Sequence, residues 1–183
     1  MIQGEGVRLR RAQPEDAPFL VELLTSEEVE PFLAAVSARD SEGILAEIER
    51  SLGEPENFGR FLIEVWEGGE WRHAGLLGFQ ARNRRSRIAA LERMALHPRF
   101  RGRGIALQAT RLLQRYLLVD LGYHRLELEI YGFNERAIRH AQRAGFVLEG
   151  RRRRAYWRHG AWTDGVLFGL TQEDVEERGE QAS

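Results

Sequence analysis

The spacing of apolar and polar residues predicts a chain that alternates between strands and helices. Residues 7–11 alternate apolar and charged side chains, as a strand with one buried face does. Helical spacing of apolar residues follows in two segments, 14–24 and 41–52, and either Asp40 or Ser41 can cap the second helix. The beginning of the chain therefore predicts one strand followed by two helices.

The rest of the chain repeats these two patterns around turn signals. The segments 61–66 and 71–79 flank Gly68-Gly69 and predict a β-hairpin. The later segments predict, in order, a strand over 88–96, a helix over 106–121, a strand over 125–131, a helix from Asn134 to just before Gly145, and extended segments over 146–157 and 162–170. Together they predict a single α/β domain over 1–183, with a mixed, mostly antiparallel sheet of about seven strands, helices on both faces, and 172–183 as a polar helix or tail.

Composition narrows the classes of function. The formal net charge of -1 argues against a surface that coats nucleic acid. The chain has no cysteine, which excludes a thiolate nucleophile, and its apolar runs are far shorter than a membrane helix needs. Its first residues lack a signal-peptide pattern and its histidines are scattered, so we expect a cytoplasmic protein without a metal site.

The segment 101–106 carries the clearest chemical signal, because a glycine-containing turn there joins a predicted strand to a predicted helix. Unpaired backbone N–H groups at the start of a helix bind anions, and the arginines add positive charge. The spacing suits a pyrophosphate. Two glycines alone also fit an ordinary turn, and the missing phosphate-loop lysine disfavours nucleotide binding.

Two longer motifs support the pyrophosphate interpretation. The pattern Arg101-x-x-Gly104-x-Ala106, preceded by 94–98, resembles motif A of the GNAT acetyltransferase superfamily. The segments 134–139 and 144–150 resemble motif B of the same family. The beginning and end of the chain look like the branch that acetylates the N-termini of ribosomal proteins (RimJ/RimL-type).

The resemblance implies a fold and a cosubstrate. In that family, the central pair of strands splays apart into a V-shaped cleft that holds acetyl-CoA. The backbone of Met94, Ala95 and Leu96 would bind pantetheine and stabilise the oxyanion of the reaction. Asn134 would contact the cosubstrate near the pantetheine arm. The residues implied for the pyrophosphate are Arg101, Gly102, Arg103, Gly104, Ile105 and Ala106.

The resemblance also implies catalytic groups and departs from the family at one of them. Many members place a tyrosine seven residues after the asparagine to protonate the departing thiolate, but this chain has Ala141 there. Water, Tyr131 or Tyr156 could take that role. Glu129, which matches a base carboxylate of some family members, is the first candidate for the general base, and Glu92 on the neighbouring strand is the second.

The acceptor is the least constrained part of the prediction. Deprotonating an α-amine at pH 7 costs ~1 kcal/mol and a lysine ~4.6 kcal/mol, so a weak base favours a protein N-terminus. Small-molecule amines (a polyamine, an amino acid analogue or an antibiotic) and a non-catalytic acyl-CoA-binding module remain as alternatives. The arginines of 151–154 suggest exposed residues on an edge strand rather than an anion-docking site. We expect a homodimer, because strand edges are exposed and the resemblance implies a family whose members commonly dimerise.

Overall fold

The computed structural model describes residues 1–33 and 38–181, and within them eight strands form one sheet in the order β1-β2-β3-β4-β5-β6-β8-β7. All neighbouring strands are antiparallel except β5 and β6. The strands are β1 (Ile2–Gln3), β2 (Val7–Arg11), β3 (Phe58–Glu67), β4 (Glu70–Asn83), β5 (Ile88–Leu96), β6 (Arg125–Tyr131), β7 (Val147–Arg158) and β8 (Ala161–Thr171).

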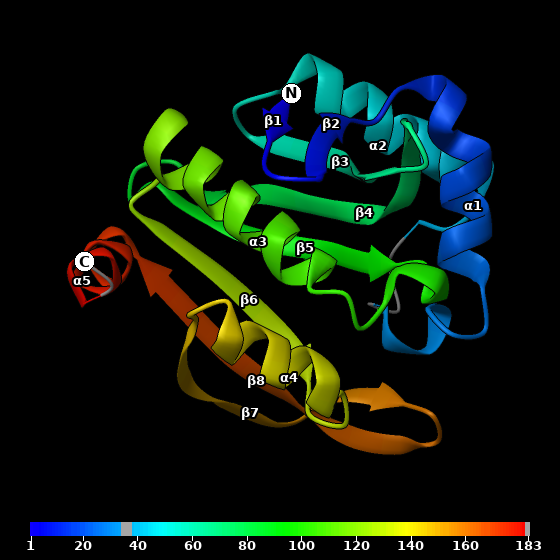
Figure 1. Ribbon diagram of the computed structural model, residues 1–183. Coiled ribbons are helices and arrows are strands. Elements are labelled where there is room, and N and C mark those ends of the chain that lie inside the picture. The colour runs from blue at the N-terminus through cyan, green and yellow to red at the C-terminus, as the bar shows by residue number, and fades with distance from the viewer. Residues whose placement is uncertain (34–37, 182–183) are drawn as a thin grey trace.

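Helices cover both faces of the sheet, as Figure 1 shows. The α-helices are α1 (Ala17–Thr25), α2 (Ser41–Gly53), α3 (Ile105–Arg115), α4 (Glu135–Arg143) and α5 (Gln172–Gln181). Short 3-10 turns are η1 (Pro14–Asp16), η2 (Glu30–Phe32) and η3 (Pro98–Phe100), and a π-helical turn, η4 (Tyr116–Asp120), continues α3. Within the described residues, no helix is both long and apolar enough to span a membrane.

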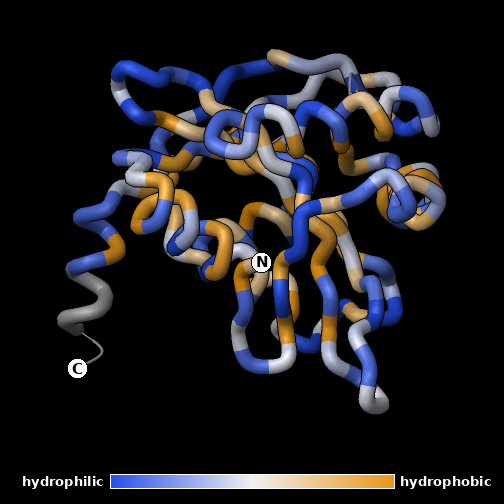
Figure 2. The backbone as a smooth tube through the Cα atoms, turned by 90° about the horizontal axis from the view of Figure 1, so that it is seen from above, coloured by the Kyte–Doolittle hydropathy of each residue, from blue (hydrophilic) through white to orange (hydrophobic). Residues whose placement is uncertain are grey.

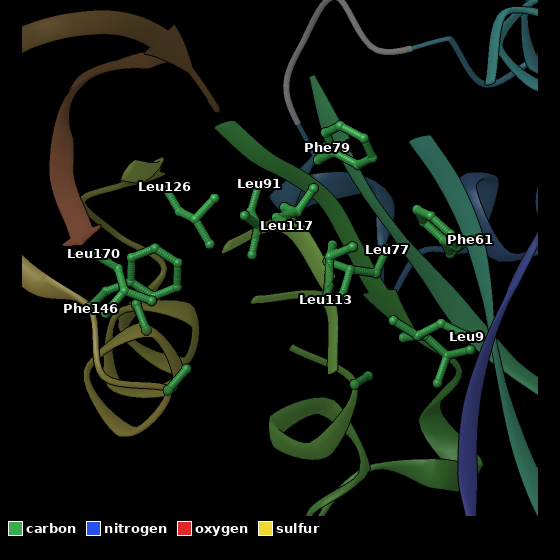
Figure 3. Packing of buried hydrophobic residues seen from close by; sticks show 14 of the residues in the cluster. Leu9, Phe61, Leu77, Phe79, Leu91, Leu113, Leu117, Leu126, Phe146 and Leu170 are labelled. Atoms are coloured by element: carbon green, nitrogen blue, oxygen red, sulfur yellow. The ribbon is translucent and has the colours of Figure 1, made fainter. Parts of the chain in front are cut away.

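The core consists of two clusters, one on each face of the sheet. The larger cluster packs β-strand side chains such as Leu77 and Leu126 against Leu113 of α3 and Phe146 (Figure 3). The smaller cluster packs α1 and α2 against the other face. Hydrophobic and hydrophilic stretches alternate along the chain in Figure 2, as expected for elements that each bury one face.

The predicted fold class is confirmed, with one more strand than expected. The additional strand, β1, pairs only Ile2 and Gln3 with β2 and is too short to produce a pattern in the sequence. Asp40 rather than Ser41 caps α2, because its side chain accepts a hydrogen bond from the N–H of Gly43. The polar C-terminal segment is helical over 172–181, and the remainder of the expected tail lies outside the described residues.

The strands β5 and β6 separate after a short ladder, and this separation positions the site. They pair in parallel at three positions only, from Ile88↔Arg125 to Ala90↔Glu127. Figure 1 shows the two strands side by side at one end and far apart at the other, with α3 and α4 on either side of the opening. The splayed central pair is therefore present.

A bulge in β5 lies at the point of separation. Leu76 of β4 pairs with Ala95 and Gly78 pairs with Glu92, so Arg93 and Met94 together face a single residue of β4. Arg93 adopts a φ of 62°, which a residue with a side chain rarely does. The extra residue bends β5 away from β6.

Candidate active site

The start of α3 presents unpaired backbone donors to the opening between β5 and β6. Gly102 and Gly104 both have a φ of 75°, and Gly104 is the N-cap of α3 without a side-chain cap. Within the described part of the chain, no backbone acceptor takes the N–H groups of residues 102–107. A side chain at either glycine would project into open space. This arrangement fits a pyrophosphate, because the donors converge at the positive end of the helix dipole.

The two arginines of this turn direct their side chains elsewhere. Arg103 donates to Glu67 at 3.0 Å. Arg101 donates through Nε to the carbonyl of Leu96 at 3.2 Å and through Nη2 to the carbonyl of Glu28 at 3.2 Å. Burial, and then the nearby charge of Arg136, lower the pKa of Arg101. The pyrophosphate cradle, which we define as residues 101–106, therefore consists of backbone groups. Arg101 links it to the segment that follows α1.

The expected pantetheine-binding segment lies on the open edge of β5. Met94 lies in the bulge, Ala95 and Leu96 follow it, and none of the three has a partner in β6 among the described residues. The carbonyl of Leu96 already accepts from Arg101, so the neighbouring backbone groups of this edge are the ones left for pantetheine. Unpaired strand groups suit an extended ligand with amides of its own.

A buried charge network supports the bulge from the side of α2. Glu47 accepts from Arg93 at 2.6 Å and from Arg60 at 2.8 Å. Arg93 also donates to the carbonyl of Ala38 at 2.7 Å. Burial opposes ionisation of Glu47, but the hydrogen bonds and charges of the two arginines outweigh it and lower the pKa of this carboxyl. The bulge thus depends on an ion pair with α2.

The two predicted base carboxylates lie on opposite sides of the opening. The register of β5 and β6 ends at Ala90↔Glu127, and two further residues along each strand are Glu92 and Glu129. Side chains two residues apart share a sheet face, so both glutamates lie on the face opposite α3 and α4. The acceptor can therefore approach from one face while the cradle holds the cosubstrate on the other.

The surroundings of the two carboxylates differ. Glu92 lies 3.6 Å from Arg60, and its Oε1 atom is buried without a hydrogen-bond partner. Glu129 lies 3.3 Å from Arg152, and its carboxylate lies beside Tyr156, next to Gly165. Burial, and then the neighbouring carboxylate of Glu129, raise the pKa of Tyr156, so its hydroxyl stays protonated at neutral pH. Glu129 and Tyr156 form a carboxylate–phenol pair that can accept and donate protons.

The first turn of α4 closes the other side of the opening. Asn134 caps this helix by accepting from the N–H of Ala137 at 3.1 Å, which leaves its amide N–H₂ group for a ligand. Ala141 is buried in the core and supplies no acid. The preceding residue, His140, lies 2.9 Å from the hydroxyl of Thr110 on α3. Burial, followed by the charge of Arg143, lowers the pKa of His140.

Four residues, which we call the roof, join the two sides of the opening on the face of Glu92 and Glu129. They are Pro31, Phe32, Arg158 and His159. The segment after α1 carries Pro31 and Phe32, and Arg158 of β7 donates to the carbonyl of Pro31 at 3.2 Å. His159 lies 3.0 Å from the same carbonyl, and the ring of Phe32 lies 6.2 Å from that of Phe133. These contacts join elements on both sides of the cleft. No periodic pattern along the chain predicts these contacts, since they link residues more than 100 positions apart.

The arginines of 151–154 lie on the outer strand of the sheet, β7, and are exposed, as the edge-strand interpretation predicted. Asp164 accepts a hydrogen bond from the N–H of Arg154 at 2.8 Å, and Arg151 lies 3.8 Å from the same carboxylate.

Comparisons with known proteins agree with this geometry. The family model for the acetyltransferase (GNAT) domain matches residues 7–147. The SPbeta prophage-derived uncharacterized N-acetyltransferase YokL of Bacillus subtilis is 32% identical over 83 residues. That match covers 45% of this chain and 47% of YokL, so it spans about half of the relative's length.

Solved structures share the fold at low sequence identity. A mutant of the spermidine N-acetyltransferase SpeG from Vibrio cholerae is similar with a TM-score of 0.81 and 18% identity, over 96% of this chain and 99% of that one. The spermidine N-acetyltransferase of Vibrio cholerae in complex with CoA and spermine has a TM-score of 0.82 and 18% identity, over 93% and 98%. Because the family model covers most of the sequence, the chain belongs to the GNAT acetyltransferase family.

Proposed function

We propose that this protein transfers the acetyl group of acetyl-CoA to a small-molecule primary amine by direct attack of the amine on the thioester. One observation carries the proposal: β5 and β6 open beside the unpaired N–H groups of α3, and Glu92 and Glu129 flank the same opening. The site thus offers donors for phosphates on one face and carboxylates for an ammonium on the other.

The residues of the cleft divide the chemistry between them. Backbone N–H groups at the open edge of β5 would stabilise the negative charge that develops on the carbonyl oxygen. Glu129 would accept the proton of the attacking amine as the C–N bond forms and the C–S bond breaks. Tyr156 or water would return a proton to the departing thiolate, which has a pKa of about 8.5 and needs little assistance.

The small-molecule acceptor is favoured over a protein N-terminus by two considerations. The solved relatives described above act on spermidine, and one contains spermine beside CoA. The roof formed by Pro31, Phe32, Arg158 and His159 connects the two sides of the opening, which suits a small acceptor better than a polypeptide chain. The assignment to the RimJ/RimL-type branch, the role of each site residue and the homodimer remain predictions from the sequence.

An acceptor screen that follows release of free thiol from acetyl-CoA tests the proposal. The chain contains neither cysteine nor lysine, so the protein contributes no thiol signal and only its own N-terminal amine. We expect release with at least one small primary amine and no release with matched tertiary amines. Turnover only with peptides would assign the N-terminal activity instead, and CoA binding without any turnover would indicate a non-catalytic module.

A further inference from the structure

We infer that the acceptor is a monoamine with an aromatic body, bound with its amino group at Glu129 and its ring on a strip of aromatic side chains. This inference rests on the proposed function and specifies its substrate class. The aromatic strip consists of Phe32, Tyr131, Phe133, Tyr156 and His159.

The strip is continuous and begins beside the carboxylate. Tyr156 lies beside Glu129 next to Gly165, and its ring lies 5.2 Å from that of Tyr131. The ring of Tyr131 stacks on Phe133 at 5.5 Å, and Phe133 lies 5.2 Å from His159. The rings come from β6, the segment after it and the hairpin of β7 and β8, so they form a surface across several elements.

Part of this surface is accessible. Phe32 is 40% exposed and Phe133 is 39% exposed, although both rings already contact aromatic neighbours. Exposed rings that converge beside a charged group are characteristic of ligand sites rather than of a core. Residues two apart on a strand, such as Glu129 and Tyr131, lie about 6.7 Å apart. A linker of two or three carbons would therefore join an amine at the first to a ring at the second.

The charges around the strip oppose a polyamine. The guanidinium of Arg136 lies 5.4 Å from the ring of Phe32, and that of Arg158 lies 5.4 Å from the ring of Tyr131. A second ammonium on the ligand would meet these cations, whereas an aromatic ring can stack against them.

Two nearby carboxylates, Glu28 and Glu30, do not offset that repulsion. They precede Phe32 in the chain, but they already pair with Arg101 and Arg39. Glu129, whose partner Arg152 is exposed, therefore provides the carboxylate for the amino group, and the strip provides contact for an apolar ring. This selectivity differs from the substrate in the names of the solved relatives.

Three amines test the inference: 2-phenylethylamine, hexylamine and spermidine, each assayed at saturating acetyl-CoA. We expect kcat/KM for 2-phenylethylamine to exceed that of the other two by about tenfold, the size of a few aromatic contacts. Calorimetric titration of 2-phenylethylamine into protein saturated with CoA, where no turnover occurs, should show the same preference in Kd.

Two pairs of variants separate the strip from general effects. Phe133→Leu should lower the preference for 2-phenylethylamine over hexylamine about tenfold, whereas Trp157→Leu, which alters the exposed Trp157–Trp162 pair, should leave it unchanged. Arg136→Gln should improve kcat/KM for spermidine, and the neighbouring Arg139→Gln should not.

The outcomes distinguish this inference from the proposed function. Efficient turnover of spermidine, or equal turnover of hexylamine and 2-phenylethylamine, would overturn the aromatic specificity and leave the acetyltransferase activity intact. Failure to acetylate any amine would overturn both.

Discussion

Single residues determine whether the cradle can hold a pyrophosphate, and Gly104 is the most direct case. Its φ of 75° lies in the region where a side chain costs about 1–2 kcal/mol, and a Cβ there would project into open space. Gly69, in the turn between β3 and β4, has a φ of 85° and equally open surroundings. The two glycines therefore share the same conformational constraint and differ in position.

We predict that Gly104→Leu weakens the binding of acetyl-CoA at least tenfold, because the side chain occupies the space of the phosphates. Gly69→Leu should lose similar stability and bind normally. Calorimetric titration and thermal unfolding of both variants measure the two effects. Equal affinity of the two variants for acetyl-CoA would show that this turn does not bind the phosphates.

Glu129 and Glu92 differ in their surroundings, and this difference predicts which one acts as the base. We expect Glu129→Gln to lower kcat about 100-fold with unchanged affinity for acetyl-CoA, the usual loss when a general base is removed. Glu92→Gln should lose less, since Arg60 beside Glu92 is buried and holds its charge close, whereas Arg152 beside Glu129 is exposed to solvent. A larger loss in Glu92→Gln would reverse the assignment.

The same variant has a readout that does not require activity. Glu129 is one of the groups that raise the pKa of Tyr156, together with burial. Glu129→Gln should therefore lower the pKa of this phenol toward its ordinary value of about 10. Ultraviolet titration of the tyrosines, compared with a Tyr156→Phe variant, detects the shift. An unchanged titration would contradict the influence of Glu129 on this phenol.

At the scale of elements, the bulge in β5 is the feature that opens the sheet, and α2 holds it in place through Glu47. We predict that Glu47→Gln lowers the free energy of unfolding by about 2 kcal/mol, because two buried arginines lose their counter-ion. The loss is not larger because Glu47 itself is partly exposed. Glu49→Gln, on the exposed face of the same helix, should change it by less than about 0.5 kcal/mol. Chemical denaturation measures both values.

The packing of α3 against α4 should be sensitive to acid. The pKa of His140 is lowered in the folded protein, so the unfolded chain binds a proton first as the pH falls through about 6.5. Stability should therefore decrease from pH 7.5 toward pH 5. Replacing His140 with Gln should reduce this decrease in denaturation experiments at the two pH values. An identical decrease in the variant would place the sensitivity elsewhere.

The elements show how far the sequence determines the structure. Local patterns predicted seven of the strands and the helices, since each buries one face with a regular period. They could not predict the bulge at Arg93, because an inserted residue leaves no periodic trace. The register that places Glu92 across from Glu129, and the aromatic strip, depend on contacts between distant segments. The cradle of 101–106 was predictable because a turn and a helix start are adjacent in sequence.

At the scale of the whole molecule, the sheet consists of two parts joined by the short ladder of β5 and β6 and by the contacts of the roof. A ligand that contacts both edges of the opening adds connections between these parts. We predict that acetyl-CoA at 100 times its Kd stabilises the folded state by about 2.7 kcal/mol and raises Tm by roughly 5–10 °C. At the same concentration of acetyl-CoA, Gly104→Leu should be stabilised by at most about 1.4 kcal/mol, and thermal scans should show a correspondingly smaller shift.

The pairing of β5 with β6 at three positions only leaves the rest of the edge of β5 free, and this free edge affects turnover. On the proposed binding mode, the pantetheine arm forms backbone hydrogen bonds with the free edge of β5, and these bonds are the same before and after the acetyl group leaves. The product CoA must then break all of them to depart, while the chemical step gains nothing from them. We therefore expect dissociation of CoA, rather than acetyl transfer, to limit the rate with the best acceptors.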